Sequence, residues 1–195
     1  MKKRDFLAAS ALGASLLPGH LLAQQTLSNL QSPALLTVTG LIGKGNRGAL
    51  DPALDQMMAK QKISFAKAFV FDFSALTALA KVSIKPTLEY DNKPHTLAGP
   101  LLSDVVQAAG SPSQGTRLLL RAIDGYNIMM SLADAKKYRF IVATHLDGHP
   151  MPLGGLGPLW AIYDADRFSD MAVKPVNERF GLCPWALYHI DVQQA

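Results

Sequence analysis

The apolar residues of this 195-residue chain come in short runs that glycine and proline separate. Its 15 glycines and 12 prolines are scattered at turns, with no period or tract that would indicate a repeat protein or a linker. Two apolar runs, 116–123 and 126–132, meet at Asp124-Gly125, a pair typical of a tight β-hairpin. With 49% apolar and 17% charged residues the chain can bury one core, so we expect a single compact domain of short elements.

The remaining pattern predicts further short strands and a few brief helices. The helix over 100–109 has the strongest signals, because Pro100 starts it, an apolar face follows and Gly110 ends it. Other helices are expected over 51–60, 74–80 and 134–138, and other strands over 35–42, 82–90, 140–146, 159–163 and 185–192. Many short strands with brief helices predict a mixed α+β domain.

The N-terminus has the order of a signal peptide. Residues 2–4 are basic, 6–17 are apolar, and the small residue Ala23 ends the segment, so we expect cleavage after 1–23 and a mature domain over 24–195. The apolar run is too short for a resident transmembrane helix, although a retained N-terminal anchor stays an alternative. The predicted location is the periplasm. The order Lys-Arg-Asp-Phe-Leu at 3–7 is similar to a twin-arginine export signal with lysine in the first arginine position.

The net charge does not favour a nucleic-acid partner. The formal charge is +4, and removal of Lys2, Lys3, Arg4 and Asp5 with the signal peptide leaves about +2. We therefore predict no nucleic-acid binding.

The sequence shows no catalytic or metal-binding motif. Cys183 is the single cysteine, so a disulfide within the chain and the usual cysteine-pair zinc sites are excluded. The histidines of the mature chain have no paired ligand spacing, and no GxSxG nucleophile elbow is present. The glycine-rich stretch 152–158 is not GxGxxG and no helix is expected after it. No catalytic residue and no metal ligand are predicted.

Several segments in order resemble the sulfite-oxidase-type molybdopterin-binding domain. They lie at 71–79, 97–105, 122–126, 143–152, 157–163 and 185–190, so the resemblance covers about 35–192. It implies an α+β domain with a mixed sheet and short helices. In the molybdenum enzymes of this family a cysteine thiolate ligates the metal from a segment that here, at 85–90, holds no cysteine, and Thr87 cannot replace this soft ligand. An arginine that helps to hold the cofactor phosphate in the family corresponds here to Trp160.

These departures make the chain similar to a subgroup of exported, non-catalytic proteins of this fold. The resemblance implies a reduced pterin as ligand, no catalytic cofactor, and a partner in the periplasmic domain of a membrane sensor or cyclic-di-GMP enzyme. One alternative is a molybdenum-cofactor-dependent periplasmic oxidoreductase, which would need Cys183 to reach the metal. Another is an adaptor without a ligand.

We expect the pterin site among charged and aromatic residues beside apolar segments. A pterin offers a ring for stacking and a guanidine-like edge that donates two hydrogen bonds to a carboxylate. Asp124 is the first candidate for that carboxylate and Glu89 the second. The remaining candidates are the walls or stacking partners Tyr90, Tyr126, Trp160 and Trp185, and Arg179 facing the ring carbonyl. The glycine loop 154–157 is expected to be ordered by the ligand and recognised by the partner.

Overall fold

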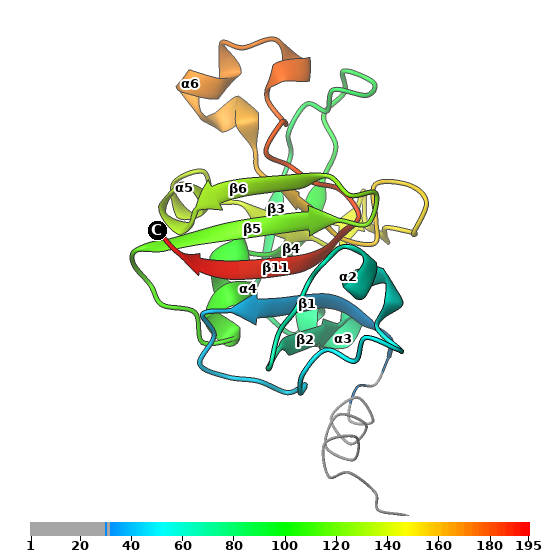
Figure 1. Ribbon diagram of the computed structural model, residues 1–195. Coiled ribbons are helices and arrows are strands. Elements are labelled where there is room, and N and C mark those ends of the chain that lie inside the picture. The colour runs from blue at the N-terminus through cyan, green and yellow to red at the C-terminus, as the bar shows by residue number, and fades with distance from the viewer. Residues whose placement is uncertain (1–29, 31) are drawn as a thin grey trace, which may run out of the picture.

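The computed structural model describes residue 30 and residues 32–195 (Figure 1). The predicted signal peptide at 1–23 lies outside these residues. Among the described residues, no helix is both long enough and apolar enough to cross a bilayer.

The main layer is a five-stranded sheet in the order β2-β1-β11-β5-β6. Its strands are β1 (Ala34–Gly40), β2 (Phe69–Asp72), β5 (Thr116–Ala122), β6 (Asn127–Ser131) and β11 (Leu187–Gln194). β1 and β11 pair in parallel, and the other neighbours are antiparallel. Strands from the two ends of the sequence therefore lie at the centre of the sheet.

A second layer packs against the inner face of this sheet. It contains the sheet β3-β4-β8-β9 and the pair β10-β7. The bounds are β3 Lys81–Ile84, β4 Leu97–Pro100, β7 Ile141–Ala143, β8 His145–Leu146, β9 His149–Pro150 and β10 Trp160–Ile162. Fully buried side chains of both layers form one core; examples are Val38, Leu120, Ile190, Val142 and Ile162.

The helices are short, as the sequence predicts. They are α2 (Gln56–Lys60), α3 (Phe73–Thr77), α4 (Leu102–Ala108), α5 (Leu132–Lys137) and α6 (Ser169–Ala172), with 3-10 turns η1 (Ala165–Arg167) and η2 (Val176–Glu178). α4 buries Leu102, Val105 and Val106 in the core. We call residues 165–182, which include η1, α6 and η2, the upper lobe; Figure 1 shows it beyond β6, at the top of the view.

The predicted hairpin at Asp124-Gly125 is confirmed, whereas several predicted boundaries differ, three of them for a plain physical reason. α4 begins at Leu102, because Pro100 ends strand β4. The helix expected from Asp51 begins only at Gln56, since the Asp51 carboxylate caps the preceding turn by accepting from the amide of Ala53 at 2.8 Å. The strand expected over 82–90 ends at Ile84, two residues before a proline that has no N–H to donate.

Candidate functional site

A cavity of about 230 Å³ lies at the tip of the β5–β6 hairpin. We call it the carboxylate cavity. Its lining comes from three segments: the loop after β3, the hairpin tip, and the segment that leads into β11. The lining residues are Glu89, Tyr90, Ala122, Asp124, Tyr126, Asn177, Phe180, Gly181, Cys183 and Trp185. The structure thus brings together five of the seven predicted ligand-binding residues.

The hairpin turn fixes the first of these side chains. Gly125 has φ +93°, a value that glycine adopts without strain, and its amide donates to the carbonyl of Ala122 at 3.1 Å. Asp124 Oδ1 accepts from the amide of Tyr126 at 2.9 Å, which holds the carboxylate at the tip. The Tyr126 hydroxyl donates to the carbonyl of Gly181 at 2.6 Å, so the hairpin tip is tied to the opposite wall.

Glu89 and Tyr90 come from the loop between β3 and β4. Buried Leu88 anchors this loop, and its amide donates to the carbonyl of Lys93 at 2.9 Å. Glu89 is half-buried and Tyr90 is 56% exposed. Partial burial, together with the neighbouring Glu89 carboxylate, raises the pKa of Tyr90. Its hydroxyl therefore stays protonated at neutral pH and can donate a hydrogen bond.

The charge of the cavity wall has one sign. Glu89 and Asp124 are the charged side chains of the lining, which includes neither lysine nor arginine. In the described part of the chain neither carboxylate forms an ion pair. The cavity is therefore suited to a ligand edge that donates hydrogen bonds or is positively charged, and unsuited to a phosphate.

Cys183 also lies in this wall, although it is far along the sequence from the segment 85–90. Its side chain is buried, and burial raises the pKa of the thiol well above its ordinary value. A neutral buried thiol is unreactive compared with a thiolate.

Trp160 lies behind the cavity instead of lining it. It is 1% exposed, and its Nε1 donates to the carbonyl of Cys183 at 2.9 Å. Its ring centroid is 6.4 Å from that of Tyr90, in a tilted arrangement. Trp160 thus supports Tyr90 and the Cys183 backbone from the core.

Arg179 points away from the carboxylate cavity into the upper lobe. Its guanidinium pairs with Asp166 at 2.7 Å and donates to the carbonyls of Lys174 and Ala172 at 2.8 and 2.7 Å. These contacts satisfy the guanidinium and hold the upper lobe together.

Three lining residues of one wall, Asn177, Phe180 and Gly181, were missed by sequence reasoning. Residues 177–183, which we call the strap, contribute Asn177, Phe180, Gly181 and Cys183. The strap has no apolar period, and its one signal in the sequence is the pair Phe180-Gly181. The glycine loop at 154–157 contributes no residue to this wall.

A larger cavity, of about 450 Å³, lies on the other side of the strap. We call it the edge cavity, because β6 forms one of its walls. Its lining residues are Arg117, Met129, Met130, Ser131, Asp134, Tyr138, Phe140, Tyr163, Met171, Lys174, Glu178, Arg179, Gly181 and Leu182. Gly181 lines both cavities.

No protein-family model matches the chain, and no curated protein matches it. Among solved structures, it is similar to the crystal structure of the sulfane dehydrogenase SoxCD from Paracoccus pantotrophus, with a TM-score of 0.55 and 11% sequence identity. The match covers 82% of this chain and 38% of that chain. The domain therefore has a mixed α+β, sulfite-oxidase-type fold, and at this identity the similarity concerns the fold alone.

Proposed function

We propose that this protein is a non-catalytic, pterin-binding sensory protein and that the carboxylate cavity is its binding site. The observation that supports this most is the lining: two carboxylates without an opposing cation, beside the aromatic side chains of Tyr90, Tyr126 and Trp185. A volume of about 230 Å³ is below the range of roughly 300–1,000 Å³ typical of sites for drug-sized ligands, and suits one small flat heterocycle.

In this proposal the carboxylate of Asp124 accepts two hydrogen bonds from the guanidine-like edge of a reduced pterin. Charge-assisted bonds of this kind are about twice as strong as neutral ones. Glu89 is the second acceptor, and its neighbour Tyr90 packs on the ring together with Trp185. Trp160 acts from behind as support, and Arg179 has no part in the site.

The lining does not fit the molybdenum cofactor. The cofactor carries a phosphate, whereas the wall offers two carboxylates and no cation. Burial favours the neutral thiol of Cys183 over the thiolate that a metal needs. The position of Cys183 in this wall is nevertheless the observation that favours a molybdenum oxidoreductase as the second candidate.

The biological setting of the proposal follows from the sequence resemblance. The mature domain acts in the periplasm and binds the periplasmic domain of a membrane-bound cyclic-di-GMP enzyme. Since it supplies no chemistry of its own, its ligand acts by changing the affinity for that partner. Such coupling is reciprocal, so the partner changes the affinity for the pterin by the same factor.

Titration of the purified protein with tetrahydrobiopterin tests the site. We expect quenching of tryptophan fluorescence, because Trp185 lines the cavity. Asp124→Asn should weaken binding by about 1–3 kcal/mol, since it removes the charged acceptor. Asp104→Asn, a carboxylate on α4, is the matched control and should leave the affinity unchanged.

Equal affinity of the wild type, Asp124→Asn and Glu89→Gln would show that the pterin site is elsewhere. Near-stoichiometric molybdenum in protein purified from the periplasm, lost on Cys183→Ser, would support the oxidoreductase instead.

A further inference from the structure

The five-stranded sheet has two edges, and the structure covers one of them with a side chain. At the β2 edge, the carboxamide of Asn46 takes the place of a neighbouring strand. Its Nδ2 donates to the carbonyl of Val70 at 2.9 Å, and its Oδ1 accepts from the amide of Val70 at 2.7 Å. Next to it, Arg47 and Ala68 form an antiparallel bridge. At Ala68 and Val70, therefore, the outward main-chain N–H and C=O groups of this edge already have hydrogen-bond partners.

The β6 edge is different. The hairpin closes with the amide of Ala122 donating to the carbonyl of Tyr126, which fixes the alternation of the β5–β6 ladder. Ile128 and Met130 therefore bond to β5, whereas Asn127 and Met129 turn their N–H and C=O groups outward. Within the described residues, no hydrogen bond reaches the outward main-chain groups of Asn127 and Met129. Unpaired edge groups of this kind are a template for another strand.

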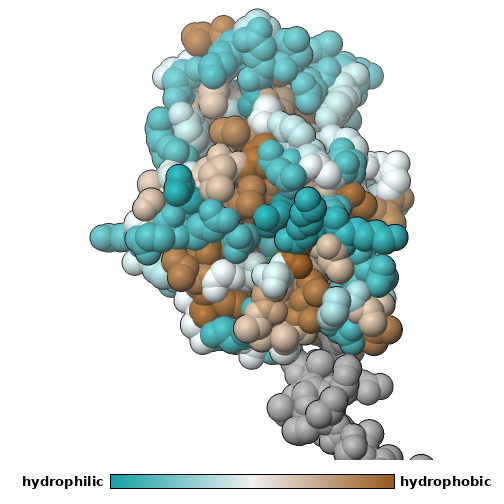
Figure 2. All heavy atoms as spheres, viewed as in Figure 1, coloured by the Kyte–Doolittle hydropathy of each residue, from teal (hydrophilic) through white to brown (hydrophobic). Residues whose placement is uncertain are grey.

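The edge cavity lies beside the second of these residues, because Met129 is part of its lining. Tyr138, Phe140 and Tyr163 contribute aromatic rings to it. Met129 on the strand and Leu182 on the strap are 41% and 43% exposed. Figure 2 shows apolar surface between the upper lobe and the sheet. The cavity thus offers apolar contacts for side chains next to an open hydrogen-bonding edge.

We propose that a partner protein adds one extended strand to the β6 edge, within the edge cavity. Main-chain hydrogen bonds supply affinity in this mode, and pockets for alternate side chains supply selectivity. The lining carries both signs of charge: Arg117 and Lys174 are basic, Asp134 and Glu178 are acidic, and Arg179 is already paired with Asp166. We therefore expect a strand without a strong net charge.

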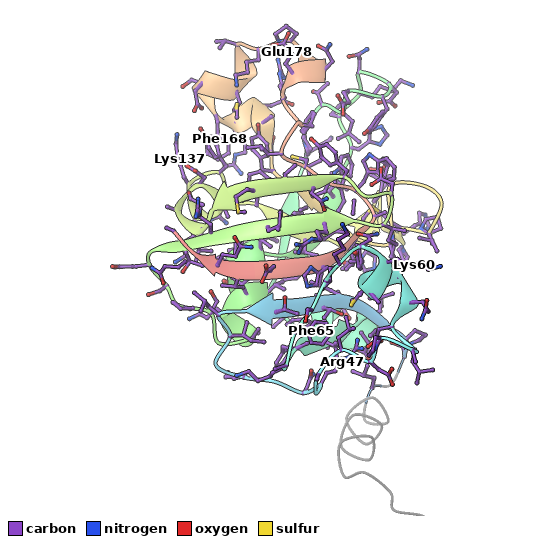
Figure 3. The ribbon with its side chains drawn as sticks, in the orientation of Figure 1. Arg47, Lys60, Phe65, Lys137, Phe168 and Glu178 are labelled. Atoms are coloured by element: carbon purple, nitrogen blue, oxygen red, sulfur yellow. The ribbon has the colours of Figure 1, made fainter. Side chains whose placement is uncertain are left out.

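A single strand fits this place better than the sheet of a second copy. The upper lobe stands beyond β6, as the labelled Phe168 and Glu178 show in Figure 3. An added strand needs only about 4.8 Å in the plane of the sheet. A second copy would bring a whole sheet and its own upper lobe to this edge, and so needs more room beside β6 than one strand does.

The strap connects the two cavities. Asn177, Phe180 and Cys183 line the carboxylate cavity, whereas Glu178, Arg179 and Leu182 line the edge cavity. A ligand that shifts this common wall changes the shape of the groove that takes the strand. This part of the inference rests on the proposed function, because it makes the strap the element through which the partner senses the pterin.

Nuclear magnetic resonance of the ¹⁵N-labelled mature chain tests strand addition. The probes are capped pentapeptides with alternating threonine and valine, serine and leucine, or lysine and valine. Each has a twin that is N-methylated at its three central residues. We expect at least one unmethylated probe to bind and to slow the hydrogen exchange of the Met129 amide, whereas its twin does not bind.

Met129→Pro and Met129→Ala form the matched pair of variants. Both remove the thioether, but only proline removes the outward N–H, and the ladder bonds of Ile128 and Met130 are kept in both. Binding should be lost in Met129→Pro and retained in Met129→Ala. Binding of the methylated twins, equal binding by the two variants, or no binding by any probe would overturn strand addition.

The link to the ligand is measured separately. Saturating tetrahydrobiopterin should change the affinity for the bound probe by about fivefold or more. Peptide binding without pterin binding would support strand addition and contradict the proposed function. If pterin and peptide both bind but neither changes the affinity for the other, the proposed coupling through the strap is contradicted.

Discussion

Two histidines show how far the surroundings decide what a residue can do. His189 is 1% exposed in β11; Arg121 donates to its Nδ1 at 2.9 Å, and its Nε2 donates to Thr39 at the same distance. Burial, with a contribution from Arg121, lowers its pKa to about 4, so it is a neutral structural group. His95, in contrast, lies between two carboxylates: Nδ1 is 2.6 Å from Asp147 and Nε2 is 3.0 Å from Asp91. These contacts raise its pKa.

His95 should make stability depend on pH. Because its folded pKa is raised, its contribution is complete below the ordinary histidine pKa of about 6.5 and is lost as the pH rises through the folded value. The pKa values of Asp147 and Asp91 are lowered, first by His95, so their contribution is lost on acidification.

Thermal melts of His95→Ala and the wild type should therefore differ most at about pH 5–6 and least at about pH 9. His149→Ala, at the start of β9 just after the Asp147-Gly148 turn, is the control and should show no such trend. A difference that stays constant over this range would contradict the carboxylate clamp.

At the scale of elements, residues that are close in sequence predicted the local structure well, whereas contacts between distant segments were not predicted. The hairpin at Asp124-Gly125 and helix α4 follow from residues that are neighbours in sequence. The strap was missed because its place depends on contacts such as Tyr126 with Gly181, 55 positions apart. Arg179 was expected at the ligand because a charge beside apolar residues needs partners, but Asp166 and two main-chain carbonyls of its own lobe supply them. Likewise, the Trp160 indole is satisfied by the Cys183 carbonyl.

The carboxamide of Asn46, which bonds to the β2 edge, leads to a further prediction. Asn46→Ala removes two hydrogen bonds and leaves the Val70 groups without a partner, so it should destabilise the domain by about 1–3 kcal/mol. Urea denaturation measures this. Asn127→Ala, on the exposed strand β6, should cost about 0.5 kcal/mol or less. Equal losses in the two variants would mean that the carboxamide of Asn46 does not protect the edge.

For the whole molecule, one scaffold holds two cavities with different chemistry. The carboxylate cavity suits a small ligand with hydrogen-bond donors, and the edge cavity suits a strand. The sequence allowed the first to be anticipated in part, since the hairpin tip and the loop after β3 carry its charged residues. It did not indicate the second, because an unpaired strand edge appears only when the order of the strands is known.

Placement in the cell is a prediction for the full chain. If the export signal is used, the exported protein should begin at Gln24, within a residue or two. Intact-mass measurement of protein from the periplasmic fraction checks this. Recovery of the uncleaved chain as the functional form in the cytoplasm would contradict it.

The central position of β11 has a consequence for how this domain comes into being. β11 joins β1 to β5, with Thr37 opposite His189 and Leu120 opposite Ile190. A nascent chain that has not yet released residues 187–194 from the ribosome therefore holds two half-sheets with nothing between them. Pairing over such long sequence separations also slows folding. The main sheet can thus close only once β11 has left the ribosome, and until then the apolar inner faces of β1 and β5 are open to aggregation.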